Sequence, residues 1–214
     1  MFDYIFFDLD GTLTDPAFGI TSACAYALNK FGIKVDDLST LNKHIGPPLH
    51  YSFMDFYGFS YDQATDAVKY YREYYSTKGL YQNVVYNGTV DMLKALKNAQ
   101  KTLVVATSKP TLYTNKILNH FGLDGYFTLV SGAGFTPESA KKPLIIESAI
   151  KALNVSDKSK IIMIGDREHD ILGARENGID SIGVLYGYGD LLELQKAGAT
   201  YIAKNQKEIL DIIL

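Results

Sequence analysis

The sequence predicts an α/β protein in which a doubly wound parallel sheet is interrupted by an inserted all-helical domain. Three observations lead to this expectation. Short and almost unbroken apolar runs recur along the chain, as in strands that are covered on both faces. Helical patterns separate the later runs, which is the alternation of a parallel sheet with its crossover helices. Between the first run and residue 88, only helical patterns occur.

Each expected strand is a short run rich in branched and aromatic apolar residues. The expected strands are Tyr4–Phe7, Leu103–Ala106, Thr128–Ser131, Ile161–Ile164, Ile182–Leu185 and Tyr201–Ala203. Apolar residues at helical spacing predict the helices Val90–Ala99, Tyr113–Phe121, Leu144–Leu153 and Ile171–Asn177. Glycines directly after two of these segments, Gly122 and Gly178, are typical helix stops.

The stretch after the first strand contains helical patterns at residues 17–32, 49–57 and 61–78. The simplest arrangement is an insertion into the sheet domain. We therefore expect residues 15–88 to form a helical domain, and residues 1–14 and 89–214 to form the α/β core domain.

The composition indicates a globular protein, because 47% of the 214 residues are hydrophobic and 21% are charged. Lys and Arg number 21 against 24 acidic residues, and no basic domain stands out, which argues against a nucleic-acid polymer as partner. No apolar run reaches the length of a membrane span, so no membrane partner is expected. A single cysteine excludes an intrachain disulfide, and the first residues lack the basic region of a secretory signal; both favour the cytoplasm.

Three polar clusters come directly after expected strands. They are Asp8-Leu9-Asp10-Gly11-Thr12, Thr107-Ser108-Lys109 and Gly165-Asp166-Arg167-Glu168-His169-Asp170. Parallel strands bring their carboxyl ends to the same edge of a sheet, where open α/β sheets bind ligands. The sequence therefore predicts one site at this edge.

Four carboxylates meet at that edge, from Asp8, Asp10, Asp166 and Asp170. They would repel one another strongly unless a cation lay among them. Oxygen ligands without a histidine pair or cysteine spacing favour Mg²⁺ over Zn²⁺. Magnesium is therefore the expected cofactor.

The same edge carries groups that suit a phosphoryl group. Thr107 and Ser108 offer hydroxyls, and the downstream pair Lys141-Lys142 offers an ammonium. We take Thr107, Ser108 and Lys142 as the candidate substrate-binding residues, with the adjacent Lys141 as the alternative lysine. The residues thus predict a magnesium-dependent phosphoryl-transfer site.

These motifs resemble those of the haloacid dehalogenase superfamily of phosphohydrolases, over essentially the whole chain. The matching segments are Asp8-Leu9-Asp10-Gly11-Thr12, Val104-Val105-Ala106-Thr107, Lys142-Pro143 and Gly165–Asp170, in the family's order. The helical block between the first two motifs resembles the family's helical cap domain. The resemblance implies a Rossmann-like core and is greatest to phosphoglycolate phosphatases.

The resemblance also implies roles. Asp8 would be the nucleophile that forms an aspartyl-phosphate, and Asp10 would protonate the leaving oxygen and later activate water. Asp8, Asp166 and the backbone carbonyl of Asp10 would bind the metal. Thr107 and Lys142 would hold the phosphate. Asp170 would support the site by orienting either metal-bound water or Lys142.

The expected function is hydrolysis of a small phosphorylated metabolite, as by a phosphoglycolate phosphatase. A 5′-nucleotidase or pyrophosphatase, or a phosphomutase similar to β-phosphoglucomutase, would use the same core. A non-enzymatic receiver-like module also carries an acidic magnesium pocket. It needs neither the insertion nor the paired Asp8 and Asp10, which favours the enzyme. The sequence leaves the oligomeric state and the exact substrate open.

Overall fold

A computed structural model describes residues 1–214, which divide into two compact units. The α/β unit consists of Met1–Asp15 and Val85–Leu214, and the helical unit consists of Pro16–Val84. The α/β fold with a parallel sheet agrees with the class that the sequence predicts.

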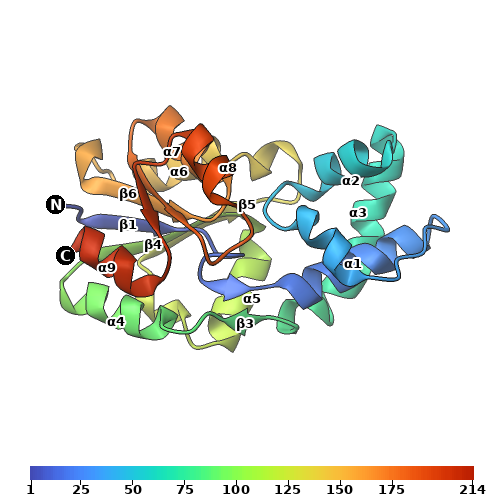
Figure 1. The fold of residues 1–214 in the computed structure, drawn as a ribbon, viewed down its shortest axis with the longest axis horizontal. Coiled ribbons are helices and arrows are strands. Elements are labelled where there is room, and N and C mark those ends of the chain that lie inside the picture. Colours follow the sequence, from blue (N-terminus) through green and yellow to red (C-terminus); the bar gives the residue numbers. More distant parts are fainter. The chain divides into compact units, whose positions relative to one another are not determined.

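The α/β unit is built on one six-stranded parallel sheet with the strand order β5-β4-β1-β6-β7-β8 (Figure 1). Its strands are β1 Tyr4–Phe7, β4 Thr102–Pro110, β5 Leu129–Ala133, β6 Ile161–Gly165, β7 Asp180–Val184 and β8 Tyr201–Ala203. The order of strands reverses between β4 and β6, on either side of β1. Such a switch point leaves a crevice at the carboxyl ends of the strands, where doubly wound folds bind ligands.

Helices cover both faces of this sheet. Helices α6, α7 and α8 lie on one face, and α4, α5 and α9 lie on the other (Figure 1). Their bounds are α4 Thr89–Asn98, α5 Thr111–His120, α6 Lys142–Ala152, α7 Glu168–Asn177, α8 Leu191–Ala197 and α9 Gln206–Ile213. Three short 3₁₀ helices complete the unit, at Asp124–Tyr126, Glu138–Ala140 and Lys158–Lys160. Phe6, Val104 and Met163 are fully buried in the core beneath α6, which explains the unbroken apolar runs of these strands.

The α/β unit differs from the sequence-based expectation by one or two residues at the ends of β5 and β7, and more substantially at β4 and in two further helices. Strand β4 continues through Pro110, so Thr107, Ser108 and Lys109 belong to the end of the strand rather than to the loop after it. The pairing of β4 with β5 shifts register between Thr107 and Pro110. Helices α8 and α9 are additional to the expected set, because seven and eight residues are too short to display a clear helical period.

The helical unit contains α1 Ala17–Asn29, α2 Leu49–Tyr57 and α3 Tyr61–Tyr75, with 3₁₀ helices at Leu38–His44 and Gly79–Tyr81. Helix α3 begins with a capping box, in which Ser60 and Gln63 satisfy each other's backbone N–H groups. The buried aromatic residues of the helical unit include Phe53 from α2 and Tyr71 and Tyr75 from α3. Helices α1 and α3 end three residues before the predicted positions.

The chain passes between the units through two short strands, β2 Thr14–Asp15 and β3 Val84–Val85, which pair with each other. Two residues are too few for a sequence pattern, so this strand pair was not predicted. None of the helices combines the length and the apolar character that crossing a membrane requires.

Candidate active site

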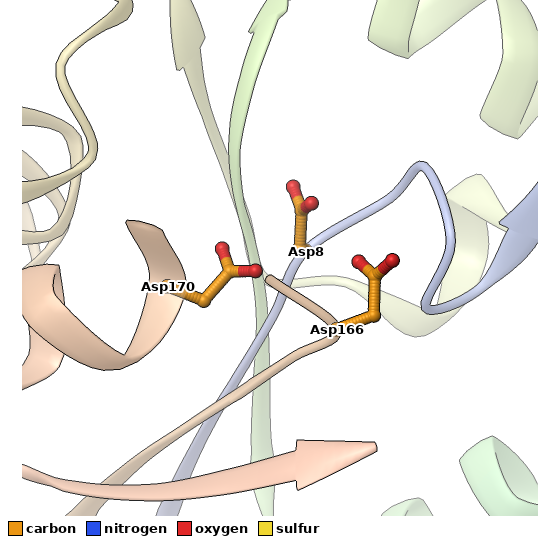
Figure 2. Close-up of side chains that lie close together, drawn as sticks. All are labelled: Asp8, Asp166 and Asp170. Atoms are coloured by element: carbon orange, nitrogen blue, oxygen red, sulfur yellow. The ribbon is translucent and has the colours of Figure 1, made fainter. Parts of the chain in front are cut away.

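Three buried carboxylates converge at the switch point of the sheet. Asp8 directly follows β1, Asp166 directly follows β6, and Asp170 lies in the first turn of α7 (Figure 2). Each offers one oxygen that lies within 4.8 Å of the others. The Asp8 N–H donates to the Ile164 carbonyl at 2.9 Å, which ties the end of β1 to β6. The parallel sheet thus brings together side chains that lie far apart in the sequence.

Lys142, the first residue of α6, supplies a positive charge to this cluster. Its ammonium lies 2.9 Å from Asp8 Oδ1 and 2.7 Å from Asp170 Oδ1, and it donates a hydrogen bond to the Ala106 carbonyl at 3.0 Å. Burial lowers the pKa of Lys142, but Asp170 and Asp8 outweigh burial and raise it above its usual range. The lysine therefore stays charged. The neighbouring Lys141 is exposed.

Asp170 is held from two sides. Its Oδ2 accepts a hydrogen bond from the Arg167 N–H at 3.2 Å, while Oδ1 faces Lys142. A carboxylate in the first turn of a helix is also favoured by the helix dipole. Burial nevertheless raises the pKa of Asp170 to about 6, against the opposing effect of Lys142.

Asp166 is held by neutral donors. Its Oδ2 accepts the Tyr188 N–H at 2.8 Å, and its Oδ1 lies 3.4 Å from the Thr12 hydroxyl, which donates to it. Gly11 allows this packing, because its φ is +82° and a Cβ there would lie 2.2 Å from Asp166 Oδ2. Burial raises the pKa of Asp166 well above its usual range, and the negative charges of Asp170 and Asp8 raise it further.

The charges of this cluster do not balance. Three carboxylates face one ammonium, and Asp8 Oδ1 and Asp170 Oδ1 both depend on that single ammonium of Lys142. Buried charges are costly unless they are paired or bind a metal. A divalent cation would neutralise the remaining two charges, and an all-oxygen set of few carboxylates suits Mg²⁺. The residues present thus fit the expected metal.

Asp10 has a separate partner. Its Oδ2 forms an ion pair with the buried ammonium of Lys109, and its Oδ1 is buried without a hydrogen-bond partner. Burial raises the pKa of Asp10 more than Lys109 lowers it. Three of the four predicted carboxylates therefore form the cluster, and the side chain of the fourth pairs with Lys109, for which no role was expected. The only sequence signal for Lys109 is its place in the polar end of β4.

The two candidate hydroxyls lie at the end of β4. Thr107 is buried, and its Oγ1 accepts the Lys109 N–H at 3.2 Å, while Ser108 is half-buried. Helix α5 has no side-chain cap, so Thr107 is not explained by helix capping. Its hydroxyl instead accepts the backbone N–H of Lys109, the residue whose side chain pairs with Asp10.

Residues 5–184 match the haloacid dehalogenase-like hydrolase family. The chain belongs to this family. A relative from Pseudomonas aeruginosa named 5′-nucleotidase is 42% identical, over 92% of this chain and 89% of its own. The crystal structure of a predicted phosphatase from Clostridium acetobutylicum superimposes with a TM-score of 0.95 at 47% identity and covers 99% of each chain.

Other relatives of this hydrolase bear different names. Tyrosine-protein kinase PtkA of Mycobacterium tuberculosis is 35% identical over 92% of this chain and 67% of its own. Phosphoglycolate phosphatase of Neisseria meningitidis serogroup A is 29% identical over 91% of this chain and 85% of its own. The family and the enzyme class that the motifs predict, a phosphatase of the haloacid dehalogenase superfamily, are thereby confirmed.

Proposed function

We propose that this hydrolase is a Mg²⁺-dependent phosphomonoesterase that cleaves a small phosphorylated metabolite through an aspartyl-phosphate on Asp8. The observation that supports this most directly is the buried cluster of Asp8, Asp166 and Asp170 around the single ammonium of Lys142. Such a cluster offers a nucleophile, a fixed positive charge and a site for a divalent cation in one place.

Asp8, Asp166 and the backbone carbonyl of Asp10 would hold the magnesium ion. When bound, the ion would offset the repulsion between the Asp8 carboxylate and the negatively charged phosphate of the substrate. The side chain of Asp170 would orient Lys142, because the Asp170 Oδ1 lies 2.7 Å from the Lys142 ammonium.

In the first step, a carboxylate oxygen of Asp8 attacks phosphorus, and the bond between phosphorus and the ester oxygen breaks. Asp10 donates its proton to the departing alkoxide, and its raised pKa suits this role because a protonated acid is required. In the second step, Asp10 accepts a proton from water as the water attacks the aspartyl-phosphate. Inorganic phosphate leaves and Asp8 is restored as a carboxylate.

Thr107, Ser108 and Lys142 would hold the phosphoryl oxygens. A hydroxyl and an ammonium both donate hydrogen bonds to such oxygens, and the ammonium also stabilises their charge. Lys142 rather than Lys141 is suited to this role, because Lys142 is buried against Asp8 and Lys141 is exposed.

We further propose that the helical unit, with the boundaries 15–88 expected from the sequence, acts as a cap that selects the substrate. A cap that closes over a site excludes water and bulky phosphates, which favours small monoesters. Nucleoside 5′-monophosphates and phosphoglycolate are the first candidates, because relatives at 42% and 29% identity are named for them.

Removal of divalent metal is expected to abolish phosphatase activity, and Mg²⁺ is expected to restore it. The test is phosphate release from a panel of nucleotides, phosphoglycolate, sugar phosphates and pyrophosphate, after treatment with EDTA and again after addition of Mg²⁺. Ca²⁺ serves as the control ion, because it prefers more ligands at longer distances. Full activity in metal-free buffer would contradict the magnesium site, and transfer of phosphate between sugar hydroxyls instead of release would indicate a mutase.

A further inference from the structure

The loop at residues 185–190, between β7 and α8, lies directly on the Asp166 carboxylate. We call it the tyrosine loop, since it contains Tyr186 and Tyr188. The Tyr188 N–H donates to Asp166 Oδ2 at 2.8 Å. A Cβ at Gly187 would lie 2.3 Å from the Asp166 Cβ and 2.4 Å from the Gly11 carbonyl oxygen, so only glycine permits this approach. The loop therefore packs against the candidate metal ligand through its backbone.

The side chains of the tyrosine loop bind the segment that leads out of the α/β unit. The Tyr188 hydroxyl donates to Asp15 Oδ1, and the Tyr186 hydroxyl donates to the Thr12 carbonyl at 3.0 Å. Asp15 is the last residue of the α/β unit before the helical unit begins. One residue, Tyr188, thus contacts the metal site through its N–H and the outgoing linker through its hydroxyl.

The returning linker reaches the same loop. Tyr86, the second residue of the chain after its return to the α/β unit, packs its ring edge-on against Tyr186, with 5.2 Å between the ring centroids. Its N–H donates to the Leu13 carbonyl at 3.2 Å, one residue from the Thr12 carbonyl that Tyr186 binds. Both ends of the insertion are therefore tied to the loop that holds Asp166.

We propose that Tyr188 is a positioning residue that joins the linker residue Asp15 to the Asp166 carboxylate of the metal site. The inference rests on the proposed function for the identity of the metal. The Tyr188–Asp15 hydrogen bond restrains the same residue whose N–H orients Asp166, so loss of that bond would loosen the ligand. Partners that orient a metal ligand commonly change metal affinity by about 10- to 100-fold when they are removed.

The test is the Mg²⁺ affinity of the whole chain without substrate, measured by titration calorimetry. Tyr188→Phe and Asp15→Ala are each expected to weaken binding by about tenfold. The double variant is expected to lose less affinity than the product of the two single losses, because both substitutions remove the Tyr188–Asp15 hydrogen bond. Asp15→Asn keeps an acceptor oxygen and is expected to retain binding within about twofold of the unaltered protein. Cooperative thermal unfolding of each variant ensures that folded proteins are compared.

Tyr26→Phe is the matched control, since the Tyr26 hydroxyl also donates to a carboxylate, that of Glu73 in the helical unit. Its Mg²⁺ affinity is expected to be unchanged. Unchanged affinity in Tyr188→Phe, or losses that multiply in the double variant, would overturn the inference while leaving the phosphatase proposal intact. Absence of Mg²⁺ binding in the unaltered protein would instead overturn the magnesium site itself.

Discussion

Replacement of Asp8 by asparagine is expected to reduce kcat by at least about 10⁴-fold, the scale on which loss of a nucleophile acts in other hydrolases. The amide oxygen carries no negative charge and attacks phosphorus poorly, and the proposed covalent step depends on that attack. The variant should still fold, because asparagine has nearly the same shape and removes one charge from a repulsive buried cluster. The measurement is steady-state hydrolysis of the best substrate from the panel.

Asp91→Asn is the matched control for this substitution. Asp91 is an exposed carboxylate in the first turn of α4, in the same unit, and its replacement should leave kcat unchanged. If Asp8→Asn retained multiple turnovers within about tenfold of the unaltered enzyme, Asp8 would not be the nucleophile.

Replacement of Lys142 by methionine is expected to lower the free energy of unfolding by about 3–5 kcal/mol, as when one partner of a buried ion pair is removed. Methionine fills a similar volume but leaves Asp8 and Asp170 buried without their shared positive charge. The measurement is urea unfolding in EDTA, so that bound metal does not contribute to stability. Activity in Mg²⁺ is expected to be lost as well.

The adjacent Lys141 provides the control. It is exposed, so Lys141→Met should change the free energy of unfolding by no more than about 0.5 kcal/mol. Equal effects of the two substitutions would mean that the Lys142 ammonium does not hold the buried carboxylates together.

Much of the sheet could be predicted because local patterns dominate it. Tyr4–Phe7 and Ile161–Ile164 are apolar runs that only a strand covered on both faces accommodates, and the structure has strands at both positions. The convergence of Asp8 and Asp166 followed from the same reasoning, since parallel strands that flank a switch point end side by side. Strands of two residues, such as β2 and β3, are too short to show an alternation of apolar and polar residues. They are recognised only by their pairing in the folded structure.

The tyrosine loop illustrates a signal that the sequence contains but does not explain. The spacing of Gly187 and Gly189 does not match a nucleotide-binding motif, and nothing local assigns these glycines another role. Their role depends on Asp166, which is some twenty residues earlier in the sequence and lies against the loop only in the folded chain.

The amino-acid sequence alone is sufficient to predict the fold class, the family motifs and the edge of the sheet at which the polar side chains meet. These depend on residue type and on strand ends, which are local properties. Folding sets which side chains pair at that edge: Asp10 with Lys109, Asp170 with Lys142, and Asp166 with the Tyr188 N–H. It also buried Lys142 and left Lys141 exposed. Ion pairing and burial depend on the distances between segments that lie far apart in the sequence. The packing of the helices on the sheet sets these distances.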